Sequence, residues 1–398
     1  MSKIEQKIPE GWSVKKLKDV ANVITGSTPS TSDLTNYGTE YLFVSPVDIK
    51  DNVKFINNTV TKLSFKGHSL GRVVSAGSPL FVCIGSTIGK IAIAGQTLTT
   101  NQQINSCIVN NQNDNEFLYY VLLFNANKIR LLAGEQAVPI INKSTFEKIS
   151  FIFPPLPEQE KIAEILGTWD DGIEKLSASI EKKKLLKKGL MQKLLTGKNR
   201  LNGFTQPWKE VKLGDMCKMF SGGTPLVSEE KYYKNGNIPF IRSGEISSFK
   251  TELFITEKAL ENSSAKMIEK GDLLYALYGA TSGEIAISKI NGAINQAILC
   301  IRSTKIEISY LYYVLLNSKS IILSKYLQGG QGNLSADIVK KLSIKMPSDI
   351  NEQKAIADVL STADEEIDLL NKKLKALKEQ KKGLMQQLLT GQTRVKVN

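Results

Sequence analysis

Two stretches of the chain, residues 158–197 and 352–391, carry apolar residues at heptad spacing among lysines and acidic residues. In the second stretch the apolar positions advance in alternating steps of four and three residues from Ile356 to Leu377. This period is typical of helices that pack along a seam. At 1.5 Å per residue each predicted helix is roughly 60 Å long. The predicted helix and partner interface residues are Ile162, Leu166, Trp169, Ile173, Leu176, Ile356, Leu360, Ile367, Leu370, Leu374 and Leu377.

The two stretches are copies of one sequence, aligned without a gap, and their ends GLMQKLLTG and GLMQQLLTG differ at one position. Gly197 and Gly391 follow the last leucines, where a left-handed residue commonly ends a helix. Asn351 is the expected N-cap of the second helix. Neither apolar seam can stay in water. The simplest partner for each helix is the other one, folded back antiparallel, and the alternative partner is the neighbouring globular part.

The globular parts repeat more weakly. Residues 77–93 match residues 271–287, and both predict two buried strands around a turn with glycine at each end. The segments FLYYVLL and YLYYVLL predict a helix in each half. The predicted fold class is α+β, with two similar globular domains, each followed by a long helix, and the helices packed as an antiparallel coiled coil with pseudo-twofold repeat. The predicted boundaries are 1–155, 156–197, 198–348 and 349–398.

The repeats differ most in their loops. Residues 29–41 have little in common with residues 225–239, and residues 67–77 differ similarly from residues 262–271. A shared framework with unlike loops suits two domains that recognise two different targets.

The formal net charge of +13 is unevenly distributed. The helical stretches hold 8 lysines against 7 acidic residues and 7 against 7, so nearly all the excess lies in the globular parts. This distribution favours polyanion binding by the globular parts, although many basic proteins bind no nucleic acid. The chain has no run of 18 apolar residues, no signal-peptide core and no C-x-x-C pair. We therefore expect a cytoplasmic protein with free thiols and no membrane contact.

No group of residues predicts catalysis. The segment from Gly85 to Lys90 lacks the G-x4-G-K-[S/T] spacing of a phosphate-binding loop, and Glu284 replaces the lysine in the second half. His68, the single histidine, is expected in a loop and has no counterpart. No metal cluster or catalytic triad can therefore be built from it in both halves. We expect no catalytic residue and no metal site.

Basic and amide side chains in the loops and beside the glycine turns are candidates for DNA contact. Basic side chains neutralise phosphates or bind guanine, and amides bind adenine. For the paired Asn-Gln sequences, the alternative is a turn-closing role. The candidates are Arg72, Lys90, Asn101, Gln102, Arg242, Lys266, Asn295 and Gln296.

With these features, the chain resembles the specificity (S) subunit of a type I restriction–modification system over nearly its whole length. Residues 347–351, PSDIN, depart from the family pattern at the second helix entry. The resemblance is carried by the repeated halves, the helix openings PPLPEQEKI at 154–162 and NEQKAI at 351–356, the helix ends at 189–197 and 383–391, and the Trp-x4-Leu-x-Asp openings at Trp12 and Trp208.

The resemblance implies a non-catalytic subunit that recognises a bipartite, asymmetric double-stranded DNA target through two target recognition domains. Its helices would set the spacer between the half-sites and dock two methyltransferase (M) subunits, and two restriction (R) subunits would complete the complex. S-adenosylmethionine, ATP and Mg²⁺ would bind to those partners, with no cofactor on this chain.

Two other classes of protein remain alternatives. A scaffolding repeat protein without nucleic acid would carry its positive charge over all parts, whereas here the helices are almost neutral. An enzyme such as a stand-alone methyltransferase would need a glycine-rich cofactor loop after a strand, and the sequence lacks one.

Overall fold

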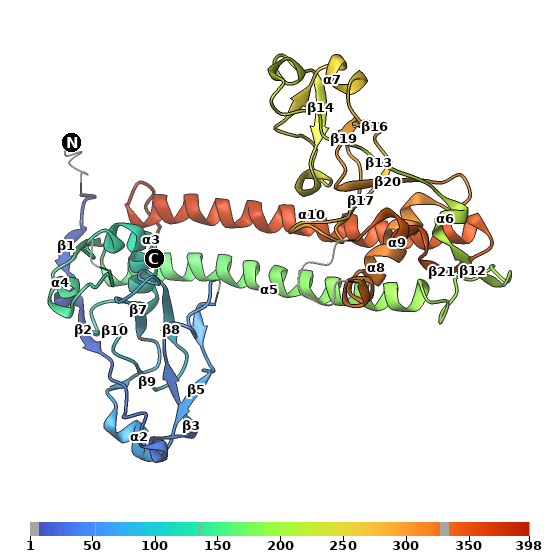
Figure 1. The fold of residues 1–398 in the computed structure, drawn as a ribbon. Helices are drawn as coiled ribbons and strands as arrows, with labels where there is room; N and C mark the ends of the chain where they lie inside the picture. Colours follow the sequence, from blue (N-terminus) through green and yellow to red (C-terminus); the bar gives the residue numbers. More distant parts are fainter. Residues whose placement is uncertain (1–7, 52, 135–136, 327–333, 398) are drawn as a thin grey trace. The chain divides into compact units, whose positions relative to one another are not determined.

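The computed structural model describes residues 8–51, 53–134, 137–326 and 334–397. These residues form two compact units (Figure 1). Unit 1 comprises Met1–Ser179 and Asn371–Asn398, and unit 2 comprises Ile180–Leu370. Two long helices, α5 (Leu156–Leu194) and α10 (Ile350–Leu389), each contribute one part to each unit. Each unit therefore combines one globular domain with segments of both helices.

The long helices lie where the heptad pattern predicts them, and each begins two residues earlier than expected. Gly197 and Gly391 both have a φ of 70°, which confirms the left-handed residues just after the helix ends. The capping prediction was wrong. Asn351 lies inside the first turn of α10, and its N–H donates to the carboxylate of Asp349 at 2.8 Å. Asp349 offers the same capping chemistry two residues earlier.

Unit 1 contains two main sheets and a short antiparallel ribbon of β1 (Ser13–Lys16) and β11 (Ser150–Phe153). The first sheet has the strand order β2 (Ala21–Thr25), β10 (Ile104–Val109), β7 (Pro79–Val82), β8 (Ile91–Ala94) and β4 (Phe55–Ile56). The second sheet has the order β5 (Thr61–Leu63), β3 (Tyr37–Val44), β9 (Leu98–Thr100) and β6 (Val73–Val74).

Unit 2 repeats this plan, with a ribbon of β12 (Trp208–Lys212) and β21 (Ser343–Pro347). The first sheet has the order β13 (Lys218–Ser221), β20 (Ile298–Arg302), β17 (Leu273–Ala276) and β18 (Ile285–Ile287). The second has the order β15 (Phe254–Ile255), β14 (Ile238–Ile241), β19 (Gly292–Ile294) and β16 (Lys266–Ile268). The pairs β3–β9 and β14–β19 are both parallel, so even the mixed strand direction recurs.

The two helices that open with FLYYVLL and YLYYVLL are α3 (Asn115–Arg130) and α8 (Ile308–Tyr326). Asp114 caps α3, because its side chain accepts a hydrogen bond from the Phe117 N–H at 2.7 Å. In unit 1, α2 lies with β3 and β5 at the end away from α5 (Figure 1). The shorter helices are α1 (Leu17–Val20), α2 (Phe65–Leu70), α4 (Lys143–Glu147), α6 (Leu213–Met216), α7 (Glu257–Glu261), α9 (Ala336–Lys340) and the 3-10 segments η1 (Leu34–Asn36), η2 (Glu230–Tyr232) and η3 (Ser243–Glu245).

The glycine-bounded segments are turns between antiparallel strands, as predicted. Gly85 and Gly89 have φ values of 90° and 97° between β7 and β8. Gly279 and Gly283 have φ values of 84° and 80° between β17 and β18. Only glycine adopts these values without strain, so a phosphate-binding loop is not needed to explain the motif.

The apolar seam of each helix is buried in two ways. In unit 1, Ile162 of α5 belongs to one apolar cluster with Phe117 of α3 and Met385 of α10. In unit 2, Ile356 of α10 lies in a similar cluster with Met191 of α5. The other helix and the neighbouring globular domain, predicted as alternative partners, are therefore both partners. The predicted fold class is confirmed, with antiparallel helix packing inside each unit.

Asp170 of α5 joins three segments of unit 1. Its carboxylate accepts a hydrogen bond from the Tyr120 hydroxyl of α3 at 2.6 Å and forms an ion pair with Lys381 of α10. The Lys381 side chain is only 11% exposed, and burial lowers the pKa of its ammonium while Asp170 opposes that shift. Burial also raises the pKa of Tyr120, so its hydroxyl stays protonated and donates. Helix α10 is thus held against both α5 and the globular domain.

The same triad recurs in unit 2 with the helices exchanged. Asp364 of α10 accepts a hydrogen bond from the Tyr313 hydroxyl of α8 at 2.8 Å, and it forms an ion pair with Lys187 of α5. A second pair joins Lys183 to Glu366 at 2.6 Å. As the residue numbers rise along α5, those of the partners fall along α10, which is the antiparallel direction.

A second carboxylate ties the chain ends of unit 1 together. Glu158, buried in the first turn of α5, accepts hydrogen bonds from the indole of Trp12 at 3.2 Å and from the guanidinium of Arg394 at 2.7 and 2.8 Å. A guanidinium binding both carboxylate oxygens is a strong, directional contact. The counterparts in unit 2 are Glu352, Trp208 and Arg200.

We predict that Asp170→Ala lowers the stability of unit 1 by roughly 2–4 kcal/mol, because it leaves the Lys381 ammonium buried without its counter-ion. We expect a loss near the lower end of this range, because the Asp170 side chain is 23% exposed and solvent therefore weakens its ion pair. Adding Lys381→Met should recover much of this loss. Hydrogen exchange of peptides from α3 measures the effect, and peptides from α8 in unit 2 serve as the internal control. Equal exchange in wild type and D170A would contradict the prediction.

Candidate nucleic-acid interface

A Gly-x-Thr-Pro segment follows the first strand of the main sheet in each unit and crosses the end of a neighbouring strand. In unit 1, Gly26 donates its N–H to the carbonyl of Ile104 at 3.1 Å. A Cβ at Gly26 would lie 2.2 Å from the carbonyl oxygen of Asn101. In unit 2, a Cβ at Gly222 would lie 1.8 Å from the carbonyl oxygen of Ile294. Glycine is required at both crossings because no side chain fits.

The Asn-Gln pair at each crossing divides into a structural and an exposed residue. Asn101 accepts a hydrogen bond from the Gln103 N–H at 3.1 Å, and Asn295 accepts one from the Ala297 N–H at 3.1 Å. These are Asx turns, in which the side chain closes the backbone. The turn-closing alternative therefore accounts for both asparagines. The glutamines that follow them, Gln102 and Gln296, are exposed.

Each exposed glutamine is bonded to the threonine of the crossing segment. The hydroxyl of Thr28 donates to Oε1 of Gln102, and the hydroxyl of Thr224 donates to Oε1 of Gln296 at 2.8 Å. Within the described residues, no hydrogen bond engages Nε2 of either glutamine. With its oxygen occupied, each amide presents its two N–H donors outward, which suits an acceptor such as a phosphate oxygen or a base edge.

A tyrosine closes the loop that follows each proline. The hydroxyl of Tyr37 donates to the carbonyl of Pro29 at 3.0 Å, and that of Tyr233 donates to the carbonyl of Pro225 at 2.6 Å. We call the Thr–Gln and Tyr–Pro bonds of each unit the loop latch. Its members are Thr28, Pro29, Tyr37 and Gln102 in unit 1, and Thr224, Pro225, Tyr233 and Gln296 in unit 2.

Sequence reasoning missed the threonines and tyrosines as functional residues. The available signal was spacing, because both tyrosines stand eight residues after the proline although the loops between them differ.

One basic residue lies beside each latch. Arg72 donates from Nη1 to the carbonyl of Thr25 at 2.7 Å, directly before the crossing segment. Lys266 of β16 pairs with Ile294 of β19, next to the Asn295 turn. Both side chains are exposed, and neither forms an ion pair with any described residue. Each unit thus brings an uncompensated positive charge and oriented amide donors together, which is the electrostatic pattern expected for a polyanion such as DNA.

Lys90 lies apart from this group. Its ammonium donates to the carbonyl of Ile49 at 3.3 Å, and it lines a cavity with Asp170 and Lys381 beside the long helices. Its position relates it to the contact between the globular domain and the helices of unit 1.

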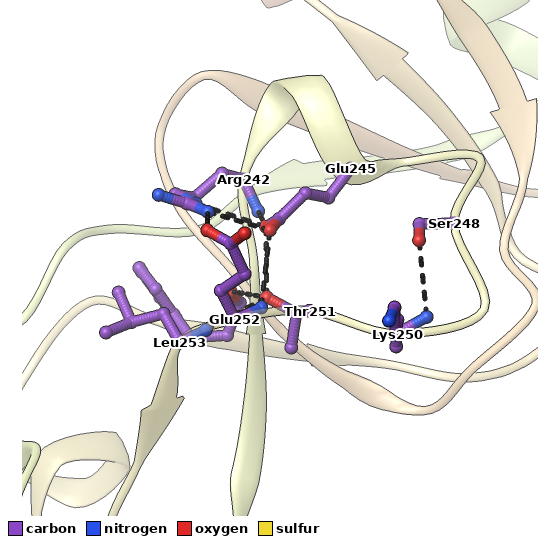
Figure 2. Close-up of polar contacts among 8 residues, drawn as sticks. Arg242, Glu245, Ser248, Lys250, Thr251, Glu252 and Leu253 are labelled. Carbon is purple, nitrogen blue, oxygen red and sulfur yellow. Dashed lines mark hydrogen bonds and ion pairs between the residues drawn. The ribbon is translucent and has the colours of Figure 1, made fainter. Parts of the chain in front are cut away.

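Arg242 also has local partners, as Figure 2 shows. Its guanidinium donates to Glu245 at 2.8 and 3.2 Å and to Glu252 at 2.9 Å. Glu245 accepts further hydrogen bonds from the Thr251 hydroxyl at 2.9 Å and from the Glu252 N–H at 3.4 Å. Two carboxylates therefore surround one guanidinium, and the local field does not favour a phosphate.

The equivalent turn of unit 1 indicates what this cluster does. There Asp48 accepts hydrogen bonds from the N–H and hydroxyl of Ser45 at 2.8 and 2.9 Å, and from the Val60 N–H at 2.8 Å. Arg242 and Glu245 replace Ser45 and Asp48 with longer side chains that close the same turn. The geometry thus gives Arg242 a turn-closing role.

The predicted helix-interface residues lie on α5 and α10, and they fall into two sets by burial. The buried residues are Ile162, Leu166, Ile173, Ile356, Leu360 and Ile367. The half-buried residues are Trp169, Leu176, Leu370, Leu374 and Leu377.

The sequence-based expectation that His68 lies in a loop was wrong. His68 lies in helix α2, where its ring stacks on the ring of Tyr41 with the ring centroids 4.3 Å apart. Among residues 8–51, 53–134, 137–326 and 334–397, no cluster of three or more His, Cys, Asp or Glu side chains is arranged to hold a metal ion. No described helix is long and apolar enough to cross a membrane.

The fold and the paired sites define a duplicated α+β protein that presents two similar, basic recognition surfaces. A family model described as the type I restriction modification DNA specificity domain matches residues 9–183 and again residues 205–379. These matches span most of the chain. The protein therefore belongs to this family, as a type I restriction–modification specificity subunit with two target recognition domains.

Relatives and solved structures agree with this assignment. The chain is 27% identical to the type I restriction enzyme MjaVIII specificity subunit of Methanocaldococcus jannaschii, covering 98% of this chain and 95% of that one. It is 33% identical to the HindI specificity subunit of Haemophilus influenzae over 48% of this chain and 42% of that one. The fold resembles the S subunit crystal structure from M. genitalium, with a TM-score of 0.64, 17% identity and coverage of 97% and 98%.

We predict that Arg242→Ala removes most of the acid sensitivity of the Glu245 turn. Hydrogen bonds from Arg242 lower the pKa of Glu245 from 4.5 to about 2. The resulting stability is present above pH 4.5 and is lost as the pH falls from 4.5 toward 2. Unfolding of unit 2 followed by hydrogen exchange at pH 7 and pH 3 measures this difference. At pH 7 the variant should lose only a small part of its stability, because the guanidinium is half-exposed and the ion pair is screened by solvent.

Glu252→Ala is the matched control. It removes the partner that is 87% exposed, so we expect a change within about 0.5 kcal/mol. An unchanged acid-dependent loss in R242A would show that other donors, rather than Arg242, set the Glu245 pKa.

Proposed function

We propose that this specificity subunit recognises a bipartite, asymmetric sequence in double-stranded DNA, with one target recognition domain on each half-site. Its helices dock two methyltransferase subunits and thereby two restriction subunits in the cytoplasm. Catalysis, S-adenosylmethionine, ATP and Mg²⁺ belong to those partners. This chain supplies sequence recognition and assembly.

One observation carries the proposal. Both units form the same latch with a basic residue beside it, Arg72 or Lys266, but they present different side chains around this frame. A repeated frame places equivalent donors on two similar surfaces, which suits two segments of one duplex. Unlike side chains on that frame predict unlike half-sites, since base contacts specify sequence whereas phosphate contacts position the protein. The basic excess of the globular parts supports the same partner.

The long helices carry features that suit protein docking. In unit 2, Leu185 and Leu186 of α5 and Leu369 of α10 are 68%, 63% and 67% exposed. Several exposed leucines on long helices are typical of a protein contact surface. These residues support the docking of partner subunits on the helices.

The decisive experiment is methylome sequencing of a host that expresses this subunit with its cognate methyltransferase subunit. We expect one split, asymmetric methylated motif. Replacing residues 1–155 by the matching domain of another family member should then change one half of the motif and leave the other half intact. Co-purification of the methyltransferase subunit with both chains is the control for assembly.

Two outcomes would contradict the proposal. A contiguous or symmetric motif would show that the domains do not act on separate, different half-sites. A swap that alters both halves would show that recognition is not divided between the domains.

We further predict that Arg72→Ala and Lys266→Ala each reduce the slope of log affinity against log salt by about 1, because each removes one phosphate contact. Fluorescence anisotropy of the assembled methyltransferase complex on a labelled target measures this slope. Lys16→Ala and Lys212→Ala are charge-matched controls, since both lysines are exposed and precede the short helices α1 and α6. Equal slopes for all four variants would exclude a special role for Arg72 and Lys266.

A further inference from the structure

We propose that the latched loops, Ser30–Asn36 in unit 1 and Leu226–Tyr232 in unit 2, are equivalent specificity loops whose exposed side chains determine the bases of each half-site. This inference rests on the proposed function, since it requires each unit to bind a half-site. It goes further by assigning sequence discrimination to a few positions in each domain.

The two loops have the same length and the same backbone. Each contains seven residues between the latch proline and the latch tyrosine. Each makes a turn and then one turn of 3-10 helix, η1 or η2. The residue before the 3-10 turn, Asp33 or Glu229, has φ and ψ of −101° and 92° or −91° and 87°. Side chains at equivalent positions therefore leave the backbone in the same way.

The loops also expose the same positions. The last loop residue is buried in both units, as Asn36 or Tyr232. Asp33 and Glu229 are half-buried and pair with lysines, Asp33 with Lys66 at 2.8 Å. The remaining positions are exposed in both loops, and they are Ser30, Thr31, Ser32, Leu34 and Thr35 in unit 1 and Leu226, Val227, Ser228, Glu230 and Lys231 in unit 2.

The exposed positions differ in chemistry while the frame stays the same. Four of the five carry different residues, and only Ser32 and Ser228 agree. Leu34 is 79% exposed, and Leu226 and Val227 are 66% and 78% exposed. Exposed aliphatic groups add nothing to the stability of the domain, but they can contact a thymine methyl group in the major groove. In the same loops, hydroxyl, carboxylate and ammonium groups supply the polar contacts that distinguish base edges.

The latch explains why these loops can differ. In each unit the latch holds the loop through one proline carbonyl and one Thr–Gln pair, and these residues lie outside the exposed loop positions. Substitutions at the exposed positions therefore leave the latch bonds intact, and among these positions Thr35 and Lys231 also bond to Asp33 and Glu229 within the loops. The outward N–H donors of Gln102 and Gln296 are the same in both units, so they suit a phosphate, which is present at every target.

Equal length and backbone make an exchange experiment possible. The variant S30L/T31V/L34E/T35K places the exposed side chains of the second loop on the first domain and leaves Asp33, Asn36 and the latch unchanged. It is expressed as the full chain with the cognate methyltransferase subunit, and the methylome is sequenced. We expect a changed half-site for unit 1 and an unchanged half-site for unit 2. The reverse variant L226S/V227T/E230L/K231T should alter only the other half-site.

Two control variants separate specificity from folding and anchoring. V47T/V60T changes two valines of unit 1 that are 67% and 81% exposed and lie outside the loop, and it should keep the motif. Thr28→Val removes one latch hydrogen bond, so we expect about fivefold slower methylation of the same motif. A new methylated motif in V47T/V60T would count against the assignment of specificity to the loop. Wild-type methylation rates in T28V would count against the role of the latch.

The outcomes also separate this inference from the proposed function. If the wild-type complex methylates no split motif, the proposed function fails. If wild type does so and the exchanged loop methylates the same motif, the loop assignment is overturned. If the exchanged variant methylates nothing, selection of bound sequences from a random DNA library decides. Enrichment altered only at the half-site of unit 1 supports the inference, and enrichment unchanged or lost at both half-sites overturns it.

Discussion

The ion pairs of Asp170 with Lys381 and of Asp364 with Lys187 are the contacts on which the rest of the structure depends. Each pair joins α5 to α10, and a tyrosine hydroxyl links each carboxylate to a globular domain. A buried charge needs its partner, so unit 1 is complete only with the C-terminal part of α10, and unit 2 needs the parts of α5 and α10 that flank its globular domain. Because the partners lie 211 and 177 residues apart, folding must close long loops before these contacts form.

Sequence patterns predicted the parts of the fold that depend on local chemistry. The heptads gave α5 and α10, and the φ values of Gly85 and Gly197 confirm the turn and the helix end. Patterns could not show that the first turn of α5 is held by Arg394, because that hydrogen bond spans 236 residues. They also presented the other helix and the globular domain as alternatives, whereas a helix with several apolar faces uses both.

The recognition surface was predictable by residue type but not by role. Arg72 and Gln102 were proposed from their chemistry, and the structure brings them to one side of unit 1. The role of Thr28 was not predicted, because its partner Gln102 lies 74 residues away and a single threonine in the sequence does not indicate a hydrogen bond. Arg242 has the same chemistry as Arg72, yet Glu245 and Glu252 occupy its guanidinium. What separates the two arginines is the set of neighbours, which requires the fold.

Duplication of the domain, followed by changes at its exposed loop positions, explains how one chain can carry two different recognition surfaces. The triads and latches are repeated, so both domains keep the same frame and the same attachment to the helices. Stability therefore resides in residues that the two halves share, and the exposed loop positions contribute little to it. Positions released from a folding role can change without unfolding the domain. A recognition protein whose targets must diversify needs that separation between the residues that fold it and the residues that contact the target.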